Sequence, residues 1–154
     1  MANYLERTFG SGGNLKKWTA SLWFKPSVVQ ANNQHIFSVV ADNGNDEGLI
    51  RHRNAGNGVI ECSQADNGVF ADLEPRNQLR DPASWYHIVY TWDSGNSTSG
   101  ERCIVYINGI RATTFGTETY PSLNADSTTN KATFKHGIGS NVHNDGWTGT
   151  RNPF

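Results

Sequence analysis

The sequence has few cysteines, no run of basic residues and no long apolar segment, and each absence excludes a class of protein. Cys62 and Cys103 are too few for a disulfide framework, and neither belongs to a Cys-x-x-Cys motif of the kind that holds structural zinc. We expect both to be buried free thiols. Because no basic patch accompanies the net charge of -1, we expect no nucleic-acid partner. No apolar run approaches the roughly 20 residues of a membrane span, so we expect no membrane partner.

The first residues also lack the charged-then-apolar order of a signal peptide. We therefore expect a chain made in the cytoplasm, or a domain excised from something longer. Its 154 residues suit one domain, 1–154, that is long enough to bury a core. The mean hydropathy of -0.59 is low, but 11% of the residues are aromatic. Few but large core residues predict thin stacked sheets with polar loops outside.

Helical periodicity is almost absent, and short alternating apolar runs recur between Gly, Asn, Asp and Pro. This spacing predicts an all-β fold, an antiparallel β-sandwich or jelly roll. The helical segments that a parallel α/β fold needs are missing. The predicted strands are Tyr4–Phe9, Trp18–Lys25, His35–Ala41, Gly48–Arg53, Gly58–Gln64, Val69–Leu73, the two long runs within Ser84–Ile107, Ile110–Phe115 and Lys131–Ile138.

The stretch Ser84–Phe115 is the clearest structural signal in the chain. Side chains alternate between the two faces of its two β-prone runs, and both faces carry bulky residues. This predicts strands that are central in a packed sheet, with aromatic side chains that belong to the core. We expect His87, inside the first run, to have a structural role. The second run ends in Asn108-Gly109, which supplies the positive φ angles of a type I′ turn and predicts a returning strand.

Three blocks carry a resemblance to a known family. They are WTASLWFKPS at Trp18–Ser27, SWYHIVYTWD at Ser84–Asp93 and CIVYINGIRATTF at Cys103–Phe115. In this order and spacing they resemble a concanavalin A-like lectin/glucanase domain of the laminin-G-like kind. The resemblance implies a concanavalin A-like jelly roll.

A narrower resemblance rests on FGSGGNLKKWTASLWFK and RDPASWYHIVYTWD, which are similar to segments of virion proteins from phages of aquatic bacteria. It implies a non-catalytic structural protein of a virion, either a capsid decoration or a tail-associated module, made in the host cytoplasm. Other virion proteins and further copies of the chain would then be its partners, together with cell-surface or environmental glycans. The alternative is a carbohydrate-binding, lectin-like module of a bacterial surface or secreted protein.

The chain departs from the family near its end, because residues after Ser140 offer little strand character. Family domains usually close with a further strand. Its absence would leave an open sheet edge that invites pairing with another chain. We expect a neighbouring subunit or virion protein to cover that edge.

The superfamily contains glucanases, so an enzyme is the first function to weigh. Retaining glycoside hydrolysis needs two carboxyls about 5–5.5 Å apart. In the glucanases they lie on one strand as Glu-x-Asp-x-x-Glu, and this motif does not occur here. Glu61 stands alone, and Glu74 precedes a proline. No Gly-x-Ser-x-Gly elbow is present either. We therefore expect a protein that is not an enzyme.

Calcium is the best metal candidate, although we expect no cofactor to be essential. The loop Asp42–Glu47 offers the hard oxygen ligands that calcium prefers, with Asp42, Asn45 and Asp46 foremost. The same residues also cluster in turns for conformational reasons alone. Both explanations stay open.

Glycan binding needs exposed aromatic side chains on which sugars stack. Trp147, Tyr120 and Phe70 lie in or near predicted loops and are the weak candidates for this role. The alternative is that these rings fill the thin core or a contact between subunits. A fold by itself proves no lectin activity.

Overall fold

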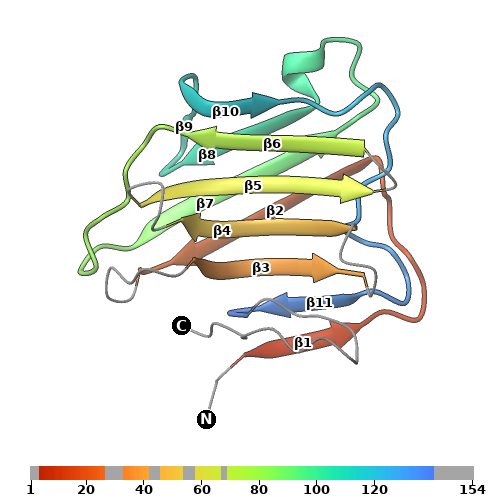
Figure 1. The fold of residues 1–154 in the computed structure, drawn as a ribbon, viewed down its shortest axis with the longest axis horizontal. Coiled ribbons are helices and arrows are strands. Elements are labelled where there is room, and N and C mark those ends of the chain that lie inside the picture. Colours follow the sequence, from red (N-terminus) through yellow and green to blue (C-terminus); the bar gives the residue numbers. More distant parts are fainter. Residues whose placement is uncertain (1–3, 27–32, 42–45, 54–57, 67–68, 141–154) are drawn as a thin grey trace.

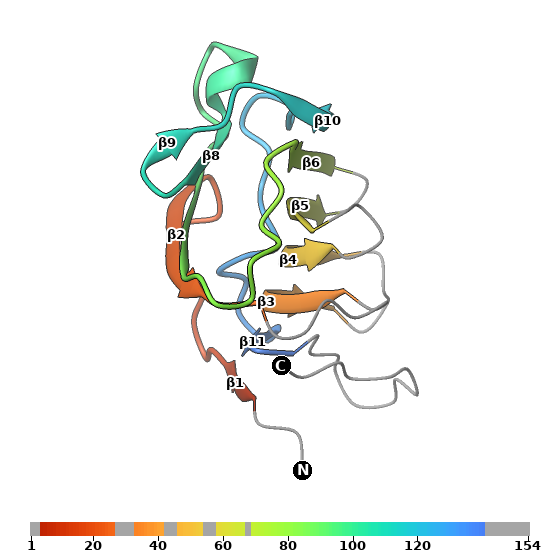
Figure 2. The ribbon, with the colours of Figure 1, turned by 90° about the vertical axis from the view of Figure 1, so that its left-hand side faces the viewer.

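The structure, a computed structural model, describes residues 4–26, 33–41, 46–53, 58–66 and 69–140. In this part of the chain eleven strands form two antiparallel sheets, which stack as a β-sandwich (Figures 1 and 2). The described residues contain no helix long and apolar enough to span a membrane. The elements are β1 (Leu5–Thr8), β2 (Lys17–Phe24), β3 (Gln34–Val40), β4 (Glu47–Arg53), β5 (Val59–Asp66), β6 (Val69–Pro75), β7 (Tyr86–Asp93), the 3-10 turn η1 (Ser99–Glu101), β8 (Cys103–Ile107), β9 (Ile110–Arg111), β10 (Phe115–Thr119) and β11 (Lys135–Ile138).

The chain passes repeatedly from one sheet to the other. The seven-stranded sheet has the order β1-β11-β3-β4-β5-β6-β10, and the four-stranded sheet has the order β2-β7-β8-β9. Figure 2 shows the two layers edge-on, with β2 and β8 in one and β3 to β6 in the other. Because the second sheet has fewer strands, it covers only part of the first.

Alternation along each strand decides which side chains enter the core. Trp18, Ala20, Leu22 and Phe24 share the inner face of β2, as predicted, and pack against the core. The inward side chains of β7 include Tyr90 and Trp92, which are almost completely buried. The two thiols are buried and free, as predicted, because each points inward from its strand.

Most predicted strands are confirmed within a residue or two, and the fold class is confirmed. The strand predicted for Ile110–Phe115 is only partly right. Beyond the Asn108-Gly109 turn, whose φ angles are 51° and 80°, β9 pairs for two residues and the chain then leaves the sheet. The next strand, β10, joins the edge of the other sheet beside β6.

The prediction that both faces of the Ser84–Phe115 strands are packed is wrong for one face. β7 does lie between β2 and β8. None of the described strands covers its outer face, however, and Trp85 just before it is 61% exposed. Residues 141–154 lie outside the described part, so the absence of a closing strand stays a prediction.

Candidate functional site

Two exposed tryptophans and a histidine lie together on the outer face of the four-stranded sheet. We call Trp23, Trp85 and His87 the outer aromatic cluster. Trp23 is 63% exposed and stands opposite His87 in the β2–β7 register. Their rings stack with centroids 4.8 Å apart and planes 21° from parallel. Trp85 lies two residues before His87 and therefore points to the same face.

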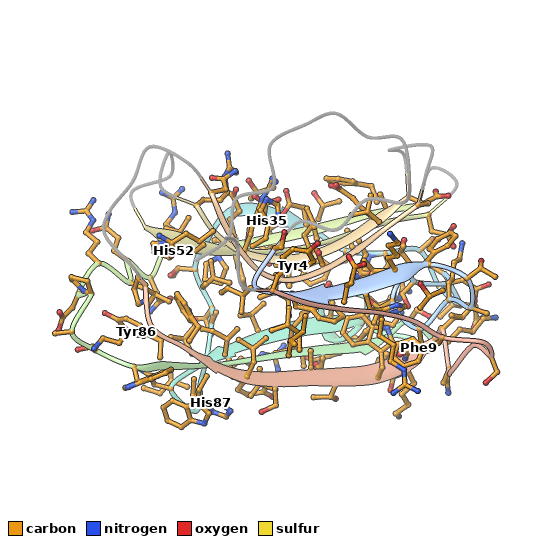
Figure 3. The ribbon with its side chains drawn as sticks, turned by 90° about the horizontal axis from the view of Figure 1, so that it is seen from below. Tyr4, Phe9, His35, His52, Tyr86 and His87 are labelled. Carbon is orange, nitrogen blue, oxygen red and sulfur yellow. The ribbon has the colours of Figure 1, made fainter. Side chains whose placement is uncertain are left out.

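Hydrogen bonds on both sides hold His87 in place. Its backbone N–H donates to Asn108 Oδ1 at 2.8 Å, and its Nε2 lies 2.9 Å from the Ser21 hydroxyl oxygen. Figure 3 shows His87 on the outer side of its strand, whereas its neighbour Tyr86 points between the sheets. The cluster is thus a preformed aromatic surface on rigid strands, and His87 has the structural contacts that we predicted.

A groove runs beside this cluster along β2, on the side where no described strand pairs with it, and we call it the β2 groove. Its volume is about 400 Å³. Trp18, Leu22, Phe37 and Ile138 provide apolar walls, and Asn130 adds a polar group. A second cavity of about 310 Å³ continues from it, because Phe37, Asn130 and Ile138 line both. A concave apolar surface with a few polar groups is the usual form of a ligand site.

The aromatic residues predicted from the sequence do not form one site. Phe70 is 51% exposed on the outer face of the seven-stranded sheet, since its neighbour Ala71 is in the core. Tyr120 packs against the core instead, and its hydroxyl donates to Glu118 Oε1 at 2.7 Å. The two rings therefore lie on opposite faces of that sheet. Trp147 falls outside the described residues.

The predicted calcium loop is described only at its end. Asp42 and Asn45 lie outside the described residues, and Asp46 is a buried residue next to β4. Across the described ranges, no group of three or more His, Cys, Asp or Glu side chains is arranged to hold a metal. The loop therefore stays a prediction.

A charged cluster on the outer face of the seven-stranded sheet was not predicted from the sequence. Glu61 on β5 receives two hydrogen bonds from Arg51, at 3.0 and 2.7 Å. Arg53 also lies 3.3 Å from Glu61 and forms an ion pair with Glu74 on β6. Both carboxylate oxygens of Glu61 are thus engaged by guanidinium groups, unlike the free nucleophile of retaining hydrolysis.

Asp72 lies beside these ion pairs, directly opposite Ser63 in the β5–β6 register. Asp72 Oδ1 and Ser63 Oγ are buried and have no hydrogen-bond partner among the described residues. Burial, together with the nearby Glu61 carboxylate, raises the pKa of Asp72 to about 6. This carboxyl therefore takes up a proton at a higher pH than an ordinary aspartate does.

Comparison with family models shows which family the chain belongs to. The model described as the concanavalin A-like lectin/glucanases superfamily, of the laminin G kind, matches residues 5–150. The chain belongs to this superfamily. The resemblance inferred from the three sequence blocks is therefore confirmed at the level of the family. A comparison with curated proteins finds no significant match.

Several solved structures have a fold similar to that of this chain, although their sequence identity to it is low. A heptameric SAP-like pentraxin from Limulus polyphemus aligns with a TM-score of 0.60 and 17% identity, covering 97% of this chain and 62% of its own. The CBM40 of a Ruminococcus gnavus IT-sialidase, solved with α2,3 sialyllactose, gives 0.60 and 12%, covering 97% and 86%. Tailspike protein 2 of Escherichia coli O157:H7 bacteriophage CAB120 gives 0.56 and 13%, covering 97% and 20%. At such identities these likenesses show the fold alone.

Sequence reasoning missed the outer aromatic cluster for a specific reason. Trp23 lies in a strand, and Trp85 directly before another, that carry bulky residues on two faces, which is typical of strands covered on both sides. Period-2 alternation separates the two faces but does not tell which one is covered. A usable signal was present in Lys17, Thr19 and Ser21, the polar residues that share the outer face with Trp23.

Proposed function

We propose that this chain is a non-catalytic glycan-adhesion module that binds sugar through the outer aromatic cluster. The observation that carries the proposal is the exposure of two tryptophans, 63% for Trp23, which stacks on His87, and 61% for Trp85, two residues before His87. Large exposed apolar side chains that gather in one place on a soluble domain commonly mark a binding surface. Indole rings offer a wide apolar face with a polar N–H, which suits the C–H faces and hydroxyls of a sugar.

The surroundings of the cluster supply groups that suit a sugar. The Ser21 hydroxyl and the Asn108 side chain lie next to His87 and can exchange hydrogen bonds with sugar hydroxyls. The Trp23 ring is already stacked on His87, so little of its side-chain entropy is lost on binding. Membership of a lectin-containing superfamily supports the proposal. So does the similar fold of the sialidase module solved with sialyllactose.

Glycan binding by single variants tests the proposal. We expect the wild-type chain to bind at least one glycan on an array. Trp23→Ala and Trp85→Ala should each weaken that binding about tenfold or more in titration calorimetry. Because both side chains are mostly exposed, each variant should lose less than about 1 kcal/mol of folding free energy.

Phe70→Ala is the matched control, since it removes an exposed aromatic ring from the other sheet. A silent array, or unchanged affinity in both tryptophan variants, would contradict the proposal. Loss of binding only in Trp147→Ala would move the site to the C-terminal segment.

The second candidate is a structural role in a phage virion. On this hypothesis the chain decorates a capsid or tail, is made in the host cytoplasm, and contacts other virion proteins. The tailspike with a similar fold is a phage protein, which supports the hypothesis. Mass spectrometry of purified particles tests it. A fixed copy number per particle is expected, and a chain found only in the soluble fraction would contradict it.

A further inference from the structure

On the basis of the proposed function, we propose the class of glycan that the outer aromatic cluster binds. It is an internal stretch of a neutral, unbranched polysaccharide of sugars with equatorial hydroxyls, the chemistry of a β-1,4-glucan. Tyr106 is a further part of the binding surface. This surface lies on the outer faces of β2, β7 and β8, all of whose residues the structure describes.

Tyr106 extends the outer aromatic cluster onto a third strand of the sheet. It lies opposite Val89 in the β7–β8 register, and Val89 is the next outward residue of β7 after His87. Its neighbours Val105 and Ile107 are buried in the core, so Tyr106 points outward, where it is half-buried. Three aromatic residues and one histidine therefore share a single face that crosses three strands.

The spacing of these residues sets the length of ligand that can contact all of them. Val89, opposite Tyr106, comes four residues after Trp85, so Tyr106 and Trp85 are about 14 Å apart between Cα atoms. Tyr106 and Trp23 are separated by two residues along and two strands across, or about 12 Å. A pyranose ring in an extended chain is about as long as one strand spacing, about 5 Å. About three consecutive sugars therefore span the surface.

The surface is the open face of a regular sheet. β7 pairs with β2 and with β8 in continuous register, without a bulge that would bend this face. Of its four side chains only Trp23 borders the β2 groove, and none lines the second cavity. A flat face contacts the broad sides of sugars, whereas recognition of a terminal sugar needs walls around it. This geometry favours an internal stretch of a longer chain.

The exposed rings favour sugars with equatorial hydroxyls. One face of the Trp23 ring rests on His87, which leaves the other face to a ligand. A pyranose with equatorial hydroxyls has C–H groups on both broad faces and hydroxyls around its rim. Its broad face can stack on an indole while its rim reaches neutral polar groups beside the cluster, such as Ser21 and Asn108.

Charge on this face favours a neutral ligand. Lys17 forms an ion pair with Asp93 at 2.7 Å. Arg111, opposite Tyr106 in the β8–β9 register, forms an ion pair with Glu101, also at 2.7 Å. An acidic polysaccharide would have to displace these carboxylates from their cations, and it would be repelled by them.

Two more cations at the border of the surface are engaged in the same way. Arg102 donates hydrogen bonds to three backbone carbonyl oxygens. Lys25, the next outward residue after Trp23, lies near the carboxylate of Asp81. A hydrogen bond from Ser84 lowers the pKa of Asp81, and the nearby ammonium of Lys25 adds to this effect. Each of these four cations thus has acceptors of its own, so none of them calls for an anionic sugar.

Titration calorimetry with cello-oligosaccharides of one to six sugars tests the ligand class. The affinity should rise with length up to about three or four sugars and then level off, because further sugars extend beyond Tyr106. The hexasaccharide should bind about tenfold more tightly than the disaccharide, or better. Reducing its end sugar to the open-chain alcohol should leave this affinity unchanged. Hydroxyethyl cellulose, which is neutral, should bind more tightly than carboxymethyl cellulose of similar length.

Variants of Tyr106 test the extent of the surface. Tyr106→Ala should remove most of the gain in affinity between the disaccharide and the hexasaccharide, because the third sugar loses its ring. Tyr106→Phe keeps the ring and should keep the gain. Phe70→Ala, which removes an exposed ring from the other sheet, is the control and should change neither affinity.

Several results would overturn this assignment and leave the proposed function standing. They are an affinity that does not depend on length, a loss of binding when the end sugar is reduced, tighter binding of carboxymethyl cellulose, and a full gain in Tyr106→Ala. Binding of other glycans alone, still lost in Trp23→Ala, also overturns only the class of glycan. A chain that binds no glycan at all contradicts the proposed function itself, and the ligand class falls with it.

Discussion

Individual side chains in this protein differ in role according to the face on which alternation places them. Trp92 and Trp23 lie on neighbouring strands, yet the first is 1% exposed and the second 63%. The same holds for acidic residues. Glu61 is buried but engaged by two arginines, whereas Asp72 has one buried oxygen without a partner. The environment of each group, not its residue type, determines what it contributes.

Asp72 should make the stability of the protein depend on pH. Its folded-state pKa of about 6 lies above the ordinary value of 3.8, so the folded state holds a proton that the unfolded chain releases between these values. Stability from this group is therefore present at low pH and is lost as the pH rises through about 6. Asp72→Asn should raise the free energy of unfolding by about 1–2 kcal/mol near pH 7.5 and by less near pH 5.

Urea unfolding at the two pH values measures this difference. Burial lowers the pKa of His52 and of His136, so these two residues favour the folded state more as the pH rises. Both are present in the wild type and in the variant, so their effect on the free energy of unfolding cancels in the comparison. Asp126→Asn, at an exposed position, is the control. An equal change in the free energy of unfolding at both pH values would show that the charge on Asp72 is not the cause.

The elements are joined by polar contacts as well as by the apolar core. Gln64 on β5 holds the segment that leads from β10 to β11. Its Nε2 donates to Thr129 Oγ1 at 3.0 Å, and its Oε1 accepts from the backbone N–H of Thr128 and Thr129 at 3.2 and 3.3 Å. These bonds are possible because Gly48, opposite Gln64 on β4, leaves room for the amide.

Gly48→Ala should therefore weaken the attachment of this segment. A Cβ atom at Gly48 would lie 2.7 Å from Gln64 Nε2 and 2.9 Å from Thr129 Oγ1, so the amide must move and lose hydrogen bonds. We expect a loss of about 2–3 kcal/mol in the free energy of unfolding. Hydrogen exchange should show faster exchange at Thr128 and Thr129. Gly10→Ala, with nothing within 4 Å of the added atom, should change little, and equal losses in both variants would contradict the explanation.

At the scale of the whole molecule, the two sheets differ in size and the sandwich is closed unevenly. Among the described residues seven strands face four, and a groove lies beside β2, while the centre is densely filled. Cys62 and Cys103 lie in that centre from opposite sheets. Burial raises the pKa of both thiols, that of Cys103 to about 12.

The thiols should therefore report on global unfolding. With exposures of 0% and 1%, Cys62 and Cys103 should react with a disulfide reagent only when the sandwich opens. The rate of labelling across a urea series should follow the loss of the circular dichroism signal, with two thiols labelled per unfolded chain. Thr113→Cys, at an exposed position, should react at once and serves as the positive control. Fast labelling of both thiols in the native protein would contradict a closed core.

The sequence by itself determined the strands, the Asn108-Gly109 turn, the inner face of β2 and the membership of a lectin-like family. These depend on local rules, namely alternation, turn chemistry and the spacing of blocks along the chain. Only the tertiary structure decided which sheet each strand joins. That choice exposed Trp23 and Trp85 beside His87 and brought Asp72 next to Glu61, because cross-strand neighbours are far apart in the chain and no local pattern specifies them.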